Sequence, residues 1–321
     1  MQRQDPSARP RLSFVVPARN EAAHIPRTLA SIHAFAPPYS YEVIVVDNGS
    51  TDATAELARG AGATVLSSAG GTIAAVRNQG VAHARGQVLV FLDADVSLTA
   101  DWQARLPHAL ALLDGARPAI TGSHCGPPDD GGWIERNWFR QFALEQGSTH
   151  LGTGHLLIRR DLFERLGGFD ESLETGEDYE FCQRAVQAGA EIVNDPALRV
   201  VHHDFPKDLP AFVRREAWHG RGDLRSWRAF LNSKVAVGAA VFLFAHLLLL
   251  LGALLPGGGR VAAAGAALLL ALLLASTWKK YRHAPWAARL VNAVLFYFYY
   301  LGRSLSFAHV LQRSAGRSKA A

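Results

Sequence analysis

The chain of 321 residues has few cysteines and no apolar stretch among its first eleven residues. Its only cysteines, Cys125 and Cys182, fit neither a zinc site nor a disulfide framework, so we expect both to be buried as small apolar side chains. Residues 1–11 are polar and contain proline, without the apolar stretch that a secretory signal needs. We therefore expect the first domain to remain in the cytosol.

Basic residues outnumber acidic ones, but they are not clustered along the sequence as they are in many nucleic-acid-binding proteins. The formal net charge is +5 and the isoelectric point about 9.4, yet no block of five or six consecutive basic residues occurs. The basic residues flank apolar segments instead, as at Arg214, Arg215, Lys234, Lys279 and Lys280. This distribution predicts an anionic membrane surface as a partner and no nucleic acid.

Long apolar runs are absent up to Asn232 and dominate afterwards. Val235 to Leu255 and Val261 to Thr277 are long enough to cross a bilayer as a hairpin, and basic residues flank both spans on one side. The composition predicts four parts. These are an N-terminal tail (1–11), a globular domain (12–232), a transmembrane helical hairpin (233–283), and an interfacial helix with a basic tail (284–321).

The globular part alternates short β-branched runs with helical patterns. Leu12 to Val16, Tyr41 to Val46 and Gln87 to Leu92 read as buried strands, and helical spacing follows each of the first two. This alternation predicts βαβ units and a mostly parallel α/β sheet. Ligands bind at the carboxyl ends of such strands, where Pro17, Asp47 and Asp93 lie.

Asp93 and Asp95 end the most apolar of these strands. Two carboxylates spaced in this way can face one edge of a sheet, and Mg²⁺ or Mn²⁺ takes such oxygens and bridges them to phosphates. The pattern predicts either a metal and nucleotide contact or a solvated turn.

Three further positions each admit two readings. Asp47 either hydrogen-bonds a base or ribose or belongs to a turn. Glu177 and Asp178 begin a helix, where they compensate its dipole or supply a general base whose pKa the neighbouring charge raises. His202, at the end of the last strand, is either a metal ligand or incidental.

Taken in chain order, these features resemble the family 2 glycosyltransferases of the GT-A fold, in their membrane-anchored bacterial form. The resemblance covers about residues 12 to 204 and implies an α/β nucleotide-sugar-binding fold with a mostly parallel sheet, followed here by the transmembrane hairpin. The matching segments are Val15–Glu21, Val46–Asp52, Arg77–Gly80, Ala84–Gly86, Asp93–Asp95, Gly152–Gly154, Arg159–Arg160, Gly167–Asp170 and Glu177–Asp178.

The resemblance also implies roles for individual residues. Asp178, with Glu177 beside it, is expected to take the proton from the acceptor hydroxyl. Asp95, His202 and Asp93 are expected to hold the metal, Mn²⁺ or Mg²⁺. The residues expected to bind the donor are Pro17, Asn20, Glu21, Asp47, Arg77, Asp93, Gly152, Thr153 and Gly154.

The implied function is an inverting, metal-dependent transfer of one sugar from a nucleotide-sugar, expected to be a UDP-sugar, to a hydroxyl acceptor. The Q-x-x-R-W motif of processive synthases is absent, which favours single transfer, and Asn48 stands where the family often has a second aspartate. We expect a multi-pass protein of the cell (inner) membrane with a cytoplasmic catalytic domain and a lipid-linked or membrane-proximal acceptor. The alternatives are a polyprenyl-phosphate glycosyltransferase and a non-catalytic nucleotide-sugar-binding membrane protein.

Overall fold

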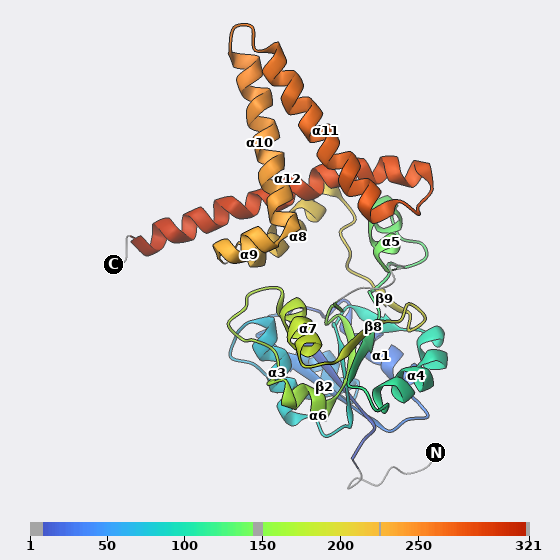
Figure 1. The fold of residues 1–321 in the computed structure, drawn as a ribbon. Helices are drawn as coiled ribbons and strands as arrows, with labels where there is room; N and C mark the ends of the chain where they lie inside the picture. The colour runs from blue at the N-terminus through green and yellow to red at the C-terminus, as the bar shows by residue number, and fades with distance from the viewer. Residues whose placement is uncertain (1–8, 144–149, 225, 319–321) are drawn as a thin grey trace. The chain divides into compact units, whose positions relative to one another are not determined.

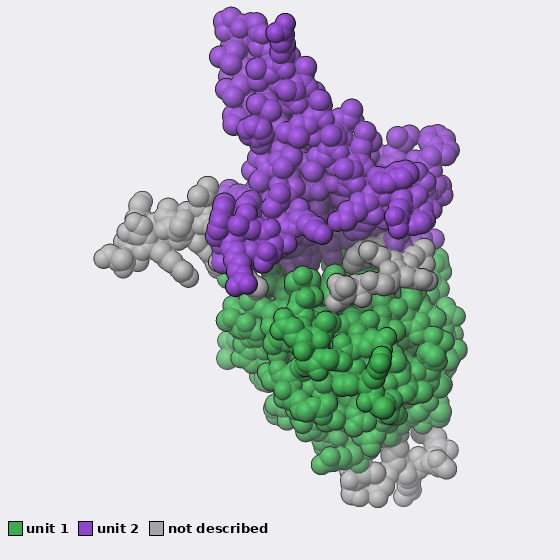
Figure 2. Space-filling model, in the orientation of Figure 1, with its two compact units in different colours: residues 1–131, 142–205 green, residues 132–141, 206–321 purple. Residues whose placement is uncertain are grey.

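The computed structural model describes residues 9–143, 150–224 and 226–318 of the chain. The chain forms two compact units, coloured separately in Figure 2. Unit 1 comprises residues 1–131 and 142–205, and unit 2 comprises residues 132–141 and 206–321. The polypeptide therefore enters unit 2 twice.

Unit 1 is built on a seven-stranded sheet (Figure 1). Its strands are β1 (Leu12–Ala18), β2 (Tyr41–Asp47), β3 (Thr64–Ser67), β4 (Val88–Leu92), β6 (Ala119–Gly122), β7 (His155–Arg159) and β8 (Glu191–Asn194). They lie in the order β3-β2-β1-β4-β7-β6-β8. β1 to β4 run parallel, β7 is antiparallel to both of its neighbours, and β8 is parallel to β6.

The central strands β1 and β4 form because their sequences are almost continuously apolar, with Ser13 of β1 as the one polar side chain. All seven residues of β1 and all five of β4 are buried, which is typical of a strand covered on both faces. The parallel register aligns Ala18 with Asp47 at the ends of β1 and β2. The predicted parallel α/β sheet is confirmed.

Helices cover both faces of the sheet and enclose two cores (Figure 1). On one face Leu29 of α1 and Trp102 of α4 are fully buried, and on the other Val76 of α3 and Phe181 of α7 are. The helices that lie within unit 1 are α1 (Ile25–Phe35), α2 (Thr54–Gly60), α3 (Ile73–His83), α4 (Ala100–Leu113), α6 (Arg160–Arg165) and α7 (Glu177–Gln187).

A two-stranded ribbon stands apart from the sheet. It pairs β5 (Val96–Leu98) antiparallel with β9 (Val200–His202), so that Val96 faces His202. Because β5 begins one residue after Asp95, this pairing brings the end of β9 to the turn that follows β4.

Unit 2 is helical in the part that the structure describes. Its helices are η1 (Glu135–Phe139), α8 (Leu209–Asp223), α9 (Trp227–Asn232), α10 (Lys234–Leu254), α11 (Gly259–Tyr281) and α12 (Trp286–Ser318), and α5 (Arg140–Ala143) straddles the boundary between the units. Residues 135–143 form a π-helical turn, η1, followed directly by α5, and residues 144–149 lie outside the described residues.

The predicted apolar hairpin is the pair α10 and α11 (Figure 1). The two helices approach closely at small residues: a Cβ added at Gly265 would lie 2.8 Å from the carbonyl oxygen of Ala245. By length and composition each could cross a membrane, and Leu250, Leu254 and Leu270 each remain more than half exposed.

The last helix, α12, packs against α8 within the same unit. A Cβ added at Gly302 would lie 2.7 Å from the carbonyl oxygen of Val213, so the crossing requires a residue without a side chain there. Arg303 pairs at this crossing with the buried Glu216 at 3.0 Å and with Asp223 at 3.2 Å. This packing places α8 in unit 2, whereas the domain boundary predicted at residue 232, which stays a prediction, assigns α8 to the first domain.

Candidate functional site

The residues predicted to form the site all belong to unit 1 and gather at one edge of its sheet. β1, β2 and β4 are parallel, so their carboxyl ends share that edge. β7 is antiparallel to β4, so the beginning of β7 lies there instead, next to Leu92. Topology thus assembles the ends of three strands and the loop Gly152 to Gly154 that precedes β7.

The loops after β1 and β2 are tied to one another. Asn20 adopts a left-handed conformation with φ of 57°, which asparagine tolerates better than most residues. Its side-chain oxygen accepts a hydrogen bond from the backbone of Thr51 at 2.8 Å, and its own N–H donates to Ser50 Oγ at 2.9 Å. The predicted donor residues Asn20 and Asp47 therefore lie on two connected loops.

The remaining donor residues of these loops are anchored in the same way. The backbone N–H of Glu21 donates to Thr54 Oγ1 at 2.7 Å, and the Glu21 carboxylate lies 3.0 Å from His24. Burial raises the pKa of Glu21. Pro17 is buried within β1, and Asp47 is 9% exposed, with its carboxylate 3.3 Å from the backbone nitrogen of Ser50.

Asp95 and His202 come together at the start of the β5–β9 ribbon. His202 Nε2 lies 3.3 Å from an Asp95 carboxylate oxygen, and the ring of His202 stacks on Phe205. Burial, followed by the charge of Asp93, raises the pKa of Asp95 to about 7. A positive charge beside Asp95 would offset this penalty, so the pair favours a cation.

Asp93 has a different partner. One of its carboxylate oxygens accepts a hydrogen bond from Arg77 at 2.8 Å, and the same guanidinium donates to Glu177 at 2.7 Å. Arg77 is 3% exposed and Glu177 is 6% exposed. The structure thus joins two predicted motifs, Asp93 with Asp95 and Glu177 with Asp178, through a buried arginine.

Asp178 lies against the loop that precedes β7. A Cβ added at Gly152 would lie 3.6 Å from Asp178 Oδ2, and one at Gly154 would lie 3.1 Å from Asp93 Oδ2. Burial raises the pKa of Asp178, and hydrogen bonds from the backbone of Tyr179 and Thr153 oppose that rise only in part. The loop therefore touches both carboxylates.

These residues fit a divalent cation with few protein ligands. Within residues 9–143, 150–224 and 226–318 no group of three or more His, Cys, Asp or Glu side chains is arranged to hold a metal ion. Asp95 and His202 supply one oxygen and one nitrogen, and Mg²⁺-type sites often complete their coordination with water and substrate phosphates. The structure leaves Asp93 on Arg77 rather than beside His202.

Sequence reasoning missed the buried supports of this edge. His155, the first residue of β7, accepts a hydrogen bond from Trp102 Nε1 at 2.8 Å, and its other ring nitrogen lies 2.9 Å from Ser123 Oγ. Ser123 in turn donates to the carbonyl of Leu198 at 2.6 Å. The available signal was a histidine inside an apolar strand directly after Gly154.

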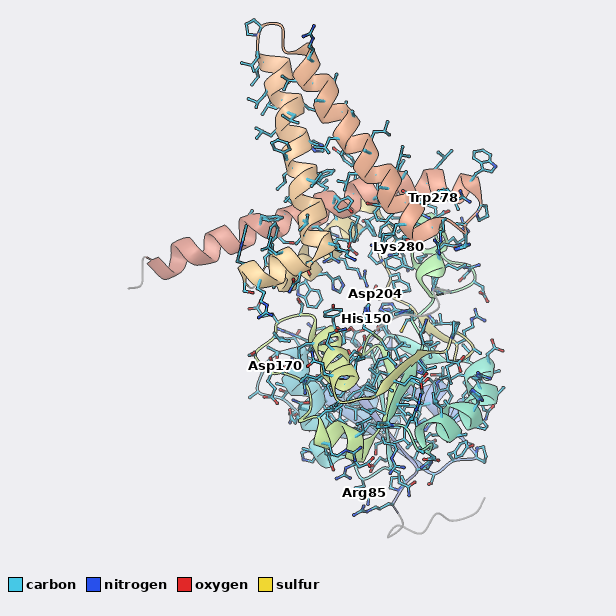
Figure 3. The ribbon with its side chains drawn as sticks, in the orientation of Figure 1. Arg85, His150, Asp170, Asp204, Trp278 and Lys280 are labelled. Atoms are coloured by element: carbon cyan, nitrogen blue, oxygen red, sulfur yellow. The ribbon has the colours of Figure 1, made fainter. Side chains whose placement is uncertain are left out.

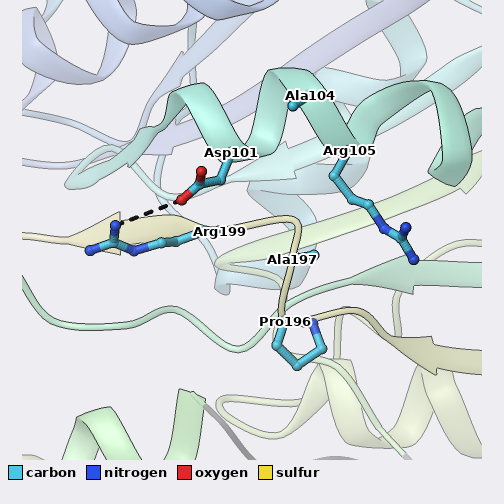
Figure 4. A pocket seen from close by; sticks show the side chains of 6 residues that line it. All are labelled: Asp101, Ala104, Arg105, Pro196, Ala197 and Arg199. Carbon is cyan, nitrogen blue, oxygen red and sulfur yellow. Dashed lines mark ion pairs between the residues drawn. The ribbon is translucent and has the colours of Figure 1, made fainter.

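A pocket elsewhere on unit 1 involves none of the predicted residues (Figure 4). It lies between α4 and the segment before β9, where Arg199 stands 3.8 Å from Asp101. Its lining residues are Asp101, Ala104, Arg105, Pro196, Ala197 and Arg199. The carboxylate chemistry lies at the sheet edge instead.

Comparisons with known proteins agree with this geometry. Residues 13–167 match the family described as Glycosyl transferase family 2, and residues 139–302 match Glycosyl transferase family group 2. Glycosyltransferase AglE of Haloferax volcanii is 28% identical over 235 residues, which cover 69% of this chain and 75% of AglE. The pre-mycofactocin glycosyltransferase of Mycobacterium tuberculosis is 27% identical over 228 residues, covering 65% of this chain but 46% of that protein.

Among solved structures, the mannosyltransferase PcManGT from Pyrobaculum calidifontis, in complex with GDP-Man and Mn²⁺, superposes with a TM-score of 0.56 at 22% identity. The match covers 94% of this chain and 87% of PcManGT, and it shows a shared fold. Given the matched families and the α/β sheet with its edge of carboxylates, the chain belongs to glycosyltransferase family 2 and is a GT-A enzyme that transfers sugar from a nucleotide-sugar.

Proposed function

We propose that this enzyme moves one sugar from a UDP-sugar to a hydroxyl of a membrane-proximal acceptor, with inversion at the anomeric carbon. The observation that carries the proposal is that one short loop lies against two carboxylates, one beside the expected metal ligands and one that can act as the base. Asp93 lies at one end of the Gly152 to Gly154 loop and Asp178 at the other, with the Asp95 and His202 pair directly beyond Asp93.

The chemistry needs a base on one side of the sugar and charge stabilisation on the other. Asp178 takes the proton from the acceptor hydroxyl while the oxygen of that hydroxyl bonds to the anomeric carbon. The bond from that carbon to the phosphate oxygen breaks, and the nucleoside diphosphate leaves with the electron pair. A base with a raised pKa, as burial gives Asp178, is suited to this work near neutral pH.

The cation site follows from the same arrangement. Asp95 and His202 would hold Mn²⁺ or Mg²⁺, with Asp93 nearby, and the bound ion supplies Lewis-acid stabilisation of charge on the departing diphosphate. PcManGT, with which the chain shares its fold, was solved with GDP-Man and Mn²⁺, which supports a metal and leaves the nucleotide to be tested.

The properties of unit 2 support a membrane-proximal acceptor. The apolar side chains of α10 and α11 that remain exposed would face lipid. Trp278 and Lys280 lie near the end of α11 (Figure 3), and Lys234 begins α10, so basic and aromatic residues mark one end of the hairpin. We propose that this end is cytoplasmic, at the same face of the membrane as the catalytic unit.

A donor panel tests the proposal. The purified full chain, with membranes as acceptor source, is incubated with UDP- and GDP-sugars and Mn²⁺, and release of the nucleoside diphosphate is measured. We expect release from a UDP-sugar and its loss on chelation. Release from a GDP-sugar alone would correct the nucleotide, and no release from any donor would refute the function.

The variant Asp95→Asn and its control Asp101→Asn connect this result to the site. Asp101 is an exposed aspartate of unit 1 at the pocket of Figure 4, outside the proposed site. We expect Asp95→Asn to abolish metal-dependent donor binding and Asp101→Asn to leave it unchanged. Equal donor binding by the two variants would contradict the assignment of Asp95.

A further inference from the structure

The guanidinium of Arg77 serves two acidic motifs at once. Its Nη2 lies 2.8 Å from Asp93 Oδ1 and its Nη1 lies 2.7 Å from Glu177 Oε1. The side chain of Arg77 is 4% exposed, and its Nε is buried without a hydrogen-bond partner. Leaving the buried Nε–H of Arg77 without an acceptor costs free energy. The side chain keeps this position nevertheless, which indicates that its two ion pairs fix it.

The planar fork of arginine suits this role. Its two terminal nitrogens can each address a separate carboxylate with fixed geometry, whereas the lysine ammonium is a single point charge on a flexible stem. Arg77 comes from the interior face of α3, and its two partners come from the end of β4 and the start of α7. The guanidinium therefore sets the spacing of two elements.

The ion pairs determine how each acidic motif presents its carboxylates. Because Asp93 uses Oδ1 on Arg77, its Oδ2 is the atom that lies against Gly154. Because Glu177 turns inward to Arg77, Asp178 is the member of the acidic pair that lies against Gly152. One buried side chain thus orients both carboxylates toward the loop.

The same helix holds the segment that leads into α7. Asn78, next to Arg77, donates to the carbonyl of Phe169 at 2.9 Å and accepts from the Phe169 backbone N–H at 3.0 Å. Thr72, the N-cap of α3, donates to the carbonyl of Glu171 at 2.9 Å. α3 therefore fixes the approach to Glu177 at three points.

We propose that Arg77 and Glu177 are a positioning pair that places Asp178 relative to Asp93, and that neither side chain touches the sugar donor. This inference rests on the proposed function, in which Asp178 is the base. It departs from the nucleotide contact that the family resemblance implies for Arg77 and from a direct catalytic role for Glu177.

The test compares Arg77→Lys, Glu177→Gln and their double variant with Arg105→Lys. Arg105 provides a matched control because it forms a 2.6 Å ion pair with Asp195 in the same unit, outside the proposed site. Each full-length protein is assayed for kcat, for KM of the donor, and for the Kd of nucleoside diphosphate with Mn²⁺. Amide hydrogen exchange is followed in peptides that cover the start of α7.

We expect Arg77→Lys and Glu177→Gln each to lower kcat by about 10- to 100-fold, the usual effect of losing a residue that orients a reactive group. KM and Kd should stay within about threefold, and the double variant should lose little more than either single one, because the two residues act as a unit. Arg105→Lys should change none of these values.

Two results would overturn the proposal. A Kd raised about tenfold or more in Arg77→Lys with kcat retained would make Arg77 a nucleotide contact. If amide hydrogen exchange at the start of α7 is the same in Arg77→Lys as in the wild type, the pair does not position this segment. This measurement does not depend on enzymatic activity. Failure of the proposed function itself is distinct, because the wild-type protein would then release no nucleoside diphosphate. If Arg77→Lys does not fold, the same measurements on Glu177→Gln, a variant that keeps the shape of the side chain, test the proposal.

Discussion

The buried histidine at the start of β7 makes the stability of unit 1 depend on pH. Both ring nitrogens of His155 are engaged, and Nε2 faces the N–H of Trp102, a group that can only donate. A proton added at Nε2 would set one N–H against another in a fully buried site. Burial accordingly lowers the pKa of His155 from 6.5 to about 3.

The sign and size of the effect follow from proton binding. Between pH 6.5 and about 3 the unfolded chain binds a proton at His155 and the folded chain does not, so the free energy of unfolding falls as the pH falls. At about 1.4 kcal/mol per pH unit, lowering the pH from 7 to 5 should remove about 2 kcal/mol through this side chain. Above pH 7 His155 should contribute no pH dependence.

The perturbation is His155→Gln, which cannot titrate, with the exposed His108→Gln on α4 as the control. The full chain in detergent micelles is unfolded in urea at pH 7 and at pH 5, and hydrogen exchange of peptides from β4 and β7 reports unit 1. The advantage of the wild type over His155→Gln should shrink by about 2 kcal/mol between the two pH values. His108→Gln should keep the pH dependence of the wild type. If His155→Gln also keeps the pH dependence of the wild type, our account of His155 is wrong.

Two further predictions concern one residue in each unit. Asp178→Asn should slow sugar transfer by about 10²- to 10⁴-fold, the usual contribution of a general base, with the Kd of nucleoside diphosphate nearly unchanged; a large loss of donor affinity would instead make Asp178 a binding residue. Arg303→Met should destabilise the crossing of α8 and α12 by about 1–3 kcal/mol, because it removes one of the two arginines, Arg303 and Arg215, that pair with the buried Glu216. Hydrogen exchange in α8 measures this loss, and adding Glu216→Gln should recover part of it; equal protection in wild type and Arg303→Met would contradict the ion pair's role.

Much of the fold could be predicted because the signals are local. A strand buried on both faces is a continuous apolar run, and the runs at β1, β2 and β4 are unmistakable in the sequence. The rule that ligands bind at the carboxyl ends of parallel strands then brings Asp47 and Asp93 to one edge before any coordinates are known. The apolar hairpin was predictable for the same reason, since length and composition define it.

What the sequence did not reveal depends on distant partners. The alternation of β9 does not show that this strand leaves the main sheet and pairs with β5, which is what brings His202 to Asp95. Arg77 in a family-like motif gives no sign that its guanidinium is turned inward. The sequence likewise gives no sign that Arg303 pairs with the buried Glu216 of α8, because this partner lies 87 residues away along the chain.

The antiparallel turn of the sheet at β7 has a consequence for how the enzyme's specificity can diverge. β6 ends and β7 begins at the same edge as β4, so the chain between Gly122 and His155 leaves the sheet and returns to it at adjacent strands. Part of that excursion, residues 132–141, belongs to unit 2. Changes of length within it leave the pairing of Thr121 with Leu157 in register. Residues 132–141 can therefore change in length or sequence without altering the residues of the donor edge, among them the Gly152 to Gly154 loop.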